Sequence, residues 1–254
     1  MTSNPFQLPG RRVIITGASS GIGRATAVKC AELGATVVCL GRNEERLQET
    51  VTSLAGSGHS HRTIDVDDAD ALTRTIETIA AEGGPLGGIV HSAGVQRVTP
   101  LRIAKAEDFL SQYRTNALSA AAILAAVAKR KVADPNGASV VLVGSVMSVL
   151  GAAGLAAYCS SKSALTGLVQ AGALELATAR IRVNAVLPGV VETEMSQKYL
   201  AALAEDQVQA IRSKHPLGLG QAEDVALSIV FLLGDAARWI TGTCLTVDGG
   251  YSAQ

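Results

Sequence analysis

Charged residues are scarce in this 254-residue chain: Asp, Glu, Lys and Arg make up 17% of it, where about 25% is usual in soluble domains. The 22 basic and 22 acidic residues cancel. This balance gives no electrostatic reason to expect a nucleic acid or an anionic membrane as a partner. Hydrophobic residues make up 48% of the sequence. Because so little charge accompanies so much apolar sequence, we expect subunit contacts in addition to a core.

The sequence also lacks the spacings of disulfide and metal sites. Its four cysteines lie far apart, with no CxxC pair, which is typical of reduced thiols that fill small apolar spaces. His59 and His61 share a polar loop, but no carboxylates stand at ligand spacing beside them. We therefore expect neither a disulfide framework nor a metal site.

No apolar run is long enough for a membrane span. The longest, ALSAAAILAAVA, is shorter than the roughly 20 residues that cross a bilayer. The first residues, MTSNPFQLPGRR, contain no apolar core of a secretory signal. We expect a cytoplasmic protein with no membrane partner.

Short apolar segments alternate with helical patterns along the chain. Seven segments predict strands, at 12–16, 35–40, 61–66, 87–94, 138–145, 181–189 and 242–247. Between them we predict helices at 24–33, 43–54, 69–81, 105–131 and 157–177. Buried strands separated by such helices are typical of a parallel sheet covered on both faces. With no linker in the sequence, we predict one α/β domain over 1–254, a Rossmann fold with a doubly wound seven-stranded parallel sheet.

A glycine-rich turn, TGASSGIG, follows the first predicted strand. In parallel sheets this turn usually binds phosphate, beyond the carboxyl end of the strand. Gly17 permits a tight turn, and Gly21 and Gly23 remove side chains where backbone must approach a pyrophosphate or pack on the strand. The motif indicates a dinucleotide site; an ordinary tight turn is the alternative.

The corner after the second predicted strand sets the preferred cofactor. A carboxylate there binds a ribose 2'-hydroxyl, whereas a cation favours a 2'-phosphate. The stretch CLGRNEERL places Arg42 at this corner, with no acid before Glu44. We therefore expect NADP(H) to be preferred, with NAD(H) possible. Alternatively, Arg42 is a surface residue paired with Glu44 or Glu45. The glycine loop itself adds no second cation for a 2'-phosphate, because Ser20 is uncharged.

Asp65 and Val66 end the third predicted strand. A carboxylate in this position can accept a hydrogen bond from the adenine amino group. Asp65, Asp67 and Asp68 can equally cap the helix that follows, and the sequence does not separate these two roles.

These motifs resemble the short-chain dehydrogenase/reductases in their single-domain form. The resemblance covers residues 12–251 and rests on TGASSGIG, DV, SAG, Asn116, Ser145, YCSSK, PGVVETEM and TGTCLTVDGG, in the order and spacing of that family. It implies an NAD(P)-dependent enzyme that transfers hydride between nicotinamide and a carbonyl or secondary alcohol. The pattern is most similar to reductases of 3-oxoacyl groups on acyl carrier protein, which use NADPH.

Tyr158 and Lys162 stand four residues apart on a predicted helix and so share one face. A free tyrosine titrates near pH ~10. Because a nearby cation favours the phenolate, we expect Lys162 to lower the pKa of Tyr158 toward working pH and make it a general acid and base. Otherwise Tyr158 is a core aromatic and Lys162 a surface residue with a buried stem.

The resemblance implies further catalytic roles. Ser145 would hydrogen-bond the substrate oxygen, and Asn116 would hold a water that links Lys162 to solvent. Lys162 would also bind the nicotinamide ribose. The alternatives are a strand-end turn residue for Ser145 and a buried structural amide for Asn116.

The resemblance also implies cofactor contacts along the chain. Besides Arg42, Asp65, Val66, Tyr158 and Lys162, these are Gly17, Ser19, Ser20, Gly21, Ile22, Gly23, Ser92, Ala93, Gly94, Pro188, Gly189, Val191 and Thr193. Thr193 can instead cap a following helix. The family often has two asparagines where this chain has His91 and Ser92. We expect Ser92 to keep a hydrogen bond and His91 to be a packing residue rather than a base.

The substrate is less well defined. An apolar pocket or ordinary core and lid packing can account for Met147, Val149, Leu150, Leu155, Met195 and Tyr199. We expect residues 195–215 to form a mobile lid.

The partner and the subunit arrangement are also open. VADPNGAS lacks the basic cluster that an acidic carrier protein favours, so a free sugar, polyol, steroid or other small alcohol or ketone is the rival substrate. A sensor that binds NADP without turnover is a third reading. We expect a homotetramer with the helices at 105–131 and 157–177 in its contacts.

Overall fold

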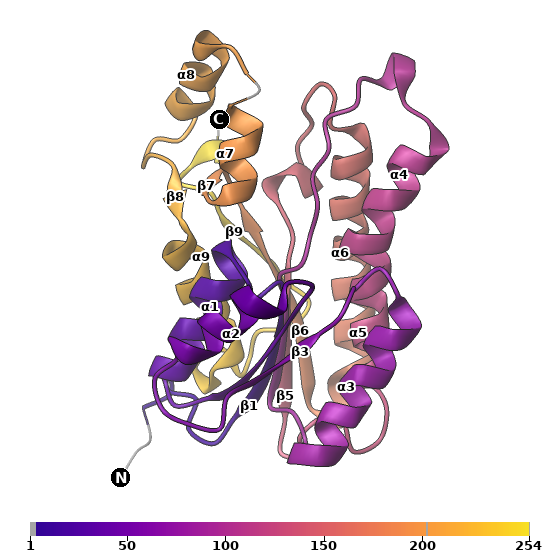
Figure 1. Cartoon of the computed structure of the whole chain (residues 1–254), viewed down its shortest axis with the longest axis vertical. Coiled ribbons are helices and arrows are strands. Elements are labelled where there is room, and N and C mark those ends of the chain that lie inside the picture. Colours follow the sequence, from indigo (N-terminus) through magenta and orange to yellow (C-terminus); the bar gives the residue numbers. More distant parts are fainter. Residues whose placement is uncertain (1–3, 202, 254) are drawn as a thin grey trace.

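The computed structural model describes residues 4–201 and 203–253. Seven strands of the described chain form one sheet in the order β3-β2-β1-β4-β5-β6-β9, with every pair parallel (Figure 1). Their bounds are β1 (Arg12–Thr16), β2 (Thr36–Gly41), β3 (Ser60–Thr63), β4 (Gly88–His91), β5 (Ala138–Val143), β6 (Ile181–Pro188) and β9 (Cys244–Val247). The predicted seven-stranded parallel sheet is confirmed.

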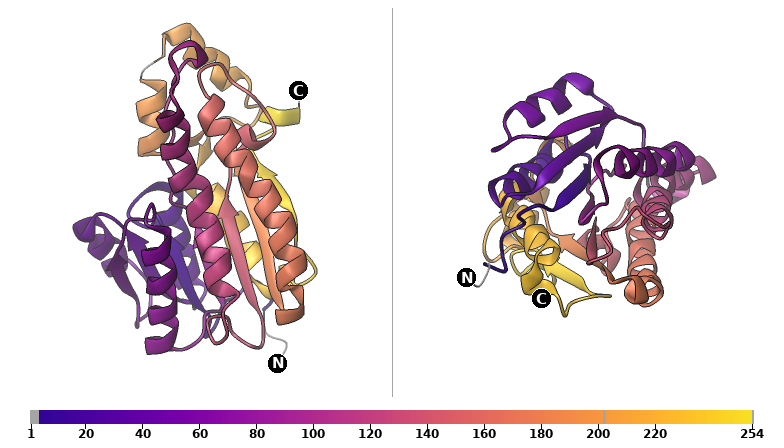
Figure 2. Two further views of the ribbon diagram at one scale, coloured as in Figure 1. Left: turned by 90° about the vertical axis from the view of Figure 1, so that its right-hand side faces the viewer. Right: turned by 90° about the horizontal axis from the view of Figure 1, so that it is seen from below.

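Helices cover both faces of this sheet (Figure 2). One face carries α1 (Gly21–Glu32), α2 (Glu44–Thr52) and α9 (Ala222–Leu233), and the other carries α3 (Ala69–Gly83), α4 (Ala106–Tyr113), α5 (Ser119–Val127) and α6 (Ala156–Leu176). Side chains alternate along each strand, so Ile14 packs in one hydrophobic cluster while Val13 and Ile15 pack in the other. This arrangement is the doubly wound fold that the alternating pattern predicts.

The single helix predicted over 105–131 is wrong in detail. It is divided into α4, a π-helical turn over Arg114–Leu118, and α5, which ends at Val127. The turn is wide at the point where the amide of Asn116 donates to and accepts from the backbone of Val95. Such π-turns often mark functional sites, and this one coincides with the contact between Asn116 and Val95.

The third strand ends earlier than predicted, at Thr63, so Asp65 and Val66 lie beyond it. The side chain of Asp65 accepts from the backbone N–H of Asp67 at 3.1 Å, and this local turn stops the strand. Asp68 accepts from the N–H of Ala71 and caps α3. The chain therefore leaves the sheet in two successive side-chain-stabilised turns.

Between β6 and α9 the described chain leaves the sheet and forms two short strands and two helices. The short strands β7 (Val191–Glu192) and β8 (Gly220–Gln221) pair in parallel at the base of this segment. Between them lie α7 (Glu194–Leu200) and α8 (Glu205–Ser213), at the same end of the molecule as the segment joining β4 to α4 (Figure 1). The lid predicted at 195–215 maps onto these helices, apart from position 202, which is outside the described residues; its mobility stays a prediction.

Among the described residues, no helix has both the length and the apolar character that crossing a membrane requires.

Candidate active site

The carboxyl ends of the strands surround a cavity of about 600 Å³. Ligands bind at this edge in open parallel sheets because the loops after several strands converge there. Of the sequence-predicted site residues, those lining it are Gly17, Ser19, Ser20, Gly21, Ile22, Arg42, Asp65, Val66, Ser92, Ala93, Gly94, Ser145, Tyr158, Lys162, Pro188, Gly189, Val191 and Thr193. Gly23 and Asn116 are not among the lining residues, and both support it from behind.

The glycine loop is shaped by two close approaches. Gly17 has a φ of 67°, and a Cβ on it would lie 2.7 Å from the backbone nitrogen of Ala93. A Cβ on Gly23 would lie 2.3 Å from the carbonyl oxygen of Gly17. The loop therefore fits against β4 and α1 only without these side chains, and it leaves the first amides of α1 facing the cavity, where an anion is favoured. This cradle fits a pyrophosphate.

Two arginines lie at the far end of the cavity. Arg42 follows β2 and lines the cavity, and it forms no salt bridge with Glu44 or Glu45 in the described part of the chain. Sequence reasoning missed Arg46, which also lines the cavity and pairs with Glu194 at the start of α7. This pairing raises the pKa of Arg46 and lowers the pKa of Glu194. The available signal was the position of Arg46 in the first turn of the predicted helix, directly after the corner that carries Arg42.

Asp65 lines the cavity beside this end, whereas Asp68 caps α3. Of the three aspartates that the sequence offered as helix caps, Asp68 is therefore the one that caps α3. The Oδ1 of Asp65 accepts the turn hydrogen bond from Asp67, and within the described ranges its Oδ2 accepts none, so this oxygen can accept from a ligand.

The reacting centre combines β5 with α6. Ser145 follows β5 and begins a 3-10 turn over Val146–Ser148, with its Oγ accepting from the N–H of Met147 at 3.2 Å. Tyr158 and Lys162 lie on the first turns of α6, and both are buried on its inner face. All three side chains line the same cavity, so the predicted convergence of the three residues is found.

The electrostatics differ from the sequence prediction in one respect. Burial raises the pKa of Tyr158, while a hydrogen bond with Ser145 acts in the opposite direction. The expected lowering by Lys162 is not among the causes of this shift. The Nζ of Lys162 donates to the carbonyl oxygen of Val143 at 2.8 Å. Burial also lowers the pKa of Lys162 to about 8. In this arrangement Ser145 is the group that favours the phenolate.

Asn116 is fully buried behind the cavity wall. Its Oδ1 accepts from the N–H of Val95, and its Nδ2 donates to the carbonyl of Val95 and to the Oγ of Ser161, each at 2.9 Å. It therefore joins the cavity-lining segment after β4 to α6, next to Lys162. These contacts are those of a buried structural amide, which was the alternative given for Asn116. The water that Asn116 would hold stays a prediction.

His91 is a buried packing residue with both ring nitrogens hydrogen-bonded. Nδ1 lies 2.8 Å from the Oγ1 of Thr16 and Nε2 lies 2.8 Å from the Oγ of Ser119. Burial, aided by the charge of Lys162, lowers the pKa of His91 to about 3. It is thus neutral at working pH. Because Thr16 also accepts from the N–H groups of Ser92 and Ala93, His91 helps to fix the cavity-lining loop after β4.

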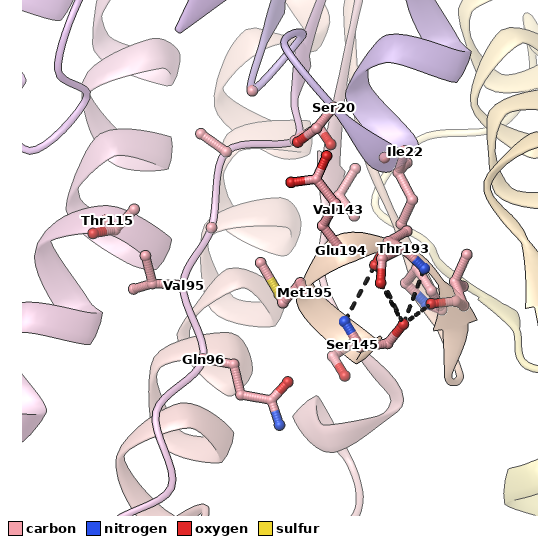
Figure 3. Close-up of a pocket in the computed structure, with 18 of the residues that line it drawn as sticks. Ser20, Ile22, Val95, Gln96, Thr115, Val143, Ser145, Thr193, Glu194 and Met195 are labelled. Carbon is pink, nitrogen blue, oxygen red and sulfur yellow. Dashed lines mark hydrogen bonds between the residues drawn. The ribbon is translucent and has the colours of Figure 1, made fainter. Parts of the chain in front are cut away.

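Thr193 both lines the cavity and caps α7. Its Oγ1 accepts from the N–H of Ser196 at 3.4 Å, and the Oγ of Ser196 accepts from the N–H of Thr193 (Figure 3). The two roles given for Thr193 as alternatives are therefore compatible.

The proposed substrate end is only partly as predicted. Met147, Leu155, Met195 and Tyr199 line the cavity, whereas Val149 and Leu150 do not. Val149 is 62% exposed, because the chain turns outward after the 3-10 turn that follows Ser145. Sequence reasoning also missed lining residues from loops and from the lid, among them Gln96, Ala152, Ile211 and Tyr251. Gln96 and Met195 lie toward Ser145 in the view of Figure 3, and Ser20 lies farther off.

Comparison with known proteins agrees with this geometry. The family profile described as Enoyl-(Acyl carrier protein) reductase matches residues 17–252. Carbonyl reductase family member 4 of Danio rerio is 38% identical over 94% of this chain and 97% of its own length. The 3-oxoacyl-(acyl-carrier-protein) reductase FabG of Thermotoga maritima is 34% identical, over 96% and 99%. D-threitol dehydrogenase of Mycolicibacterium smegmatis is 32% identical, over 98% and 95%.

Solved structures have the same fold. One from Sinorhizobium meliloti, described as a short-chain alcohol dehydrogenase, has a TM-score of 0.91 with 36% identity, covering 99% of this chain and 100% of that one. One from Agrobacterium tumefaciens, described as a 2-deoxy-D-gluconate 3-dehydrogenase with bound NADP, has a TM-score of 0.88 with 32% identity, covering 99% and 100%. The chain belongs to the short-chain dehydrogenase/reductase family and is an NAD(P)-dependent oxidoreductase.

Proposed function

We propose that this protein is an NADP(H)-dependent reductase of a carbonyl group, or the corresponding dehydrogenase of a secondary alcohol. One observation carries the proposal: Ser145, Tyr158 and Lys162 line the same cavity as Arg42. Proton transfer and recognition of a 2'-phosphate are thereby available in one site. The two hydrophobic clusters share one sheet, which supports a single catalytic domain over residues 1–254.

Each residue of the reacting centre has its own role in the proposed reaction. Bound NADPH would supply hydride to the carbonyl carbon. Tyr158 donates its phenolic proton to the carbonyl oxygen, so the C=O double bond becomes a C–OH and Tyr158 is left as phenolate. Ser145 orients the oxygen by hydrogen bonding and then stabilises the phenolate. Lys162, with a pKa of about 8, carries a proton at neutral pH and holds the nicotinamide ribose.

The walls of the cavity would hold the rest of the cofactor. We assign the pyrophosphate to the glycine loop with Ser19, Ser20 and Ile22, and the adenine to Asp65 and Val66. The nicotinamide would contact Ser92, Ala93, Gly94, Pro188, Gly189, Val191 and Thr193, all of which line the cavity. Asn116 and Gly23 support these walls from behind.

The preference for NADP(H) over NAD(H) is supported by two cations at one end of the cavity. Arg42 forms no salt bridge within residues 4–201 and 203–253, and Arg46 lies in the first turn of α2, where it pairs with Glu194. Guanidinium groups suit phosphate because they offer several N–H donors in a planar fork. The structural neighbour from Agrobacterium tumefaciens contains NADP.

For the substrate we propose a 3-oxoacyl thioester, as the name of the Thermotoga maritima relative suggests. Three exposed cations, Arg97, Arg102 and Lys105, follow the cavity-lining Gln96. They belong to the segment that joins β4 to α4, which reaches the end of the molecule where α7 and α8 lie (Figure 1). None of them forms a salt bridge among the described residues. Such a surface complements an acidic carrier protein, and it replaces the basic cluster that VADPNGAS lacks.

A free ketone or alcohol is the second candidate. The lining near Ser145 is largely apolar, with Met147, Leu155 and Met195. Among the described lining residues, the cations other than Lys162 are Arg42 and Arg46, at the opposite end. This favours a neutral substrate with an apolar body.

One assay separates these readings. NADPH oxidation should be followed with 3-oxoacyl thioesters of coenzyme A and of acyl carrier protein, and with sugars, diketones and steroids. The main proposal expects the carrier-bound thioester to give the highest kcat/KM. A free ketone that is at least tenfold better favours the second candidate. NADPH binding without turnover on any carbonyl favours a sensor and contradicts both.

We also propose a homotetramer in the cytoplasm. Exposed leucines lie along the predicted contact helices, with Leu110 at 49%, Leu118 at 53% and Leu174 at 81% exposure. Light scattering at micromolar concentration should give four times the 26.0 kDa chain mass, and a monomer would contradict the proposal.

A further inference from the structure

His215 is buried, with 4% of its surface exposed, in a segment whose other members face solvent. It follows α8, and its neighbours Pro216 and Leu217 are exposed. It is not among the lining residues of the cavity. Buried imidazole rings are normally hydrogen-bonded through their nitrogens.

Both ring nitrogens of His215 bind backbone groups. The N–H of Val190 donates to Nε2 at 3.2 Å, and Nδ1 lies 2.8 Å from the carbonyl oxygen of Ile211. Because a backbone amide can only donate, Nε2 must be unprotonated. Nδ1 then carries the hydrogen and donates it to Ile211. These contacts define the hydrogen-bonding roles of the ring, with Nδ1 as the donor and Nε2 as the acceptor.

The ring also packs between two further segments. Its centroid lies 4.7 Å from that of Tyr251, at an interplanar angle of 34°. A Cβ on Gly189 would lie 3.0 Å from its Nε2. The contacted residues Val190, Ile211, Gly189 and Tyr251 all line the cavity. One side chain thus joins three walls of the site from behind: the loop after β6, the lid helix α8 and the C-terminal segment.

We infer that His215 is a positioning residue that holds the loop at 188–191, and with it the lid, in the geometry that binds the nicotinamide end of the cofactor. This rests on the proposed function, because Gly189 and Val191, on either side of Val190, are proposed nicotinamide contacts. The Nε2 bond sets the loop, and the Nδ1 bond attaches the last turn of α8 to it. His215 touches neither substrate nor cofactor.

Two substitutions separate the two hydrogen bonds. In His215→Gln the side-chain oxygen reaches the position of Nε2 and can accept from Val190. In His215→Asn the shorter amide reaches the position of Nδ1 and can donate to Ile211, which leaves the N–H of Val190 without its acceptor. Loss of one such partner corresponds to about tenfold in an equilibrium constant.

We therefore expect His215→Asn to weaken NADPH and NADH binding by a similar factor of about tenfold. KM for both nicotinamides should rise together, and kcat should change less. His215→Gln should bind both within about twofold of wild type. Binding is measured by fluorescence titration of the whole chain without substrate, and thermal midpoints are recorded for each variant.

His59 provides a matched control. Its Nδ1 accepts from the N–H of Val37 at 3.1 Å and its Nε2 lies 2.9 Å from the carbonyl oxygen of Ala55, away from the cavity. His59→Gln, which leaves the N–H of Val37 without its acceptor as His215→Asn does for Val190, should lower the thermal midpoint without changing the affinity for either nicotinamide.

His215→Asn with wild-type affinity, or His215→Gln as weak as His215→Asn, overturns the positioning role. If His215→Asn does not fold, the result with His215→Gln decides alone, because folded protein with lost affinity contradicts the inference. Wild-type protein that binds neither nicotinamide is a failure of the proposed function, seen before any variant is made.

Discussion

Lys162 donates a hydrogen bond from its buried Nζ to the carbonyl oxygen of Val143, at 2.8 Å. Val143 is the last residue of β5, two positions before Ser145. The bond therefore fixes the helix that carries Tyr158 against the strand end that carries Ser145. It also keeps an ammonium group inside the protein, where burial lowers its pKa to about 8.

This burial predicts a pH dependence of stability. In the unfolded chain Lys162 titrates near about 10.4, and in the folded protein near about 8. Between these values the unfolded state binds more protons, so the free energy of unfolding gains a contribution that rises with pH. Below pH 8 both states are protonated, and the cost of burying the charge is fully present.

Lys162→Met removes this contribution. The free energy of unfolding of wild type minus that of Lys162→Met, from urea unfolding, should rise between pH 8 and 10 by at most about 1.4 kcal/mol per pH unit. Lys131→Met, at an exposed position, should give a difference that is flat over the same range. A flat difference for Lys162→Met would show that the ammonium group is not buried as described.

Arg42 should determine the choice between the nicotinamides. Arg42→Asp replaces a cation that suits a 2'-phosphate with a carboxylate that suits a ribose hydroxyl. We expect the ratio of kcat/KM for NADPH to that for NADH to fall by roughly 10- to 100-fold, the scale of one charge-assisted hydrogen bond. Arg130→Asp, at an exposed site outside the cavity, should leave the ratio unchanged. An unchanged ratio in Arg42→Asp would remove Arg42 from phosphate recognition.

Two glycines with similar backbone angles separate backbone strain from steric contact. Gly17 and Gly10 have φ of 67° and 71°, but a Cβ on Gly10 would meet nothing within 4 Å. Gly10→Ala should therefore lower the free energy of unfolding by only about 1–2 kcal/mol and leave cofactor affinity intact. Gly17→Ala should cost more and weaken NADPH binding by over about tenfold, since its Cβ would displace the loop at Ala93. Equal effects of the two substitutions would contradict the cradle.

Local patterns in the sequence were sufficient for the sheet and the glycine loop. The run RVIIT is followed at once by TGASSGIG, so strand, turn and helix are specified within one short stretch. The pair Tyr158 and Lys162 was also accessible, because helical spacing alone places them on one face.

Long-range contacts could not be predicted in the same way. The π-turn at Asn116 depends on the backbone of Val95, and the Arg46–Glu194 pair joins residues 148 positions apart. The pKa of Tyr158 was predicted in the wrong direction for this structure, because helical spacing does not reveal how deeply the ring is buried, and burial raises this pKa. Val149 and Leu150 were misplaced because apolar character does not show where a loop turns outward.

Tyr158→Phe tests the central claim most directly, since it removes one hydroxyl from a buried ring. The variant should be compared with wild type by NADPH titration and by single-turnover NADPH oxidation with the best carbonyl substrate. We expect NADPH affinity within about twofold of wild type and a hydride-transfer rate lower by about 10²–10⁴-fold, the usual contribution of a positioned general acid. A rate within a few fold of wild type would show that the proton comes from elsewhere and would contradict the account.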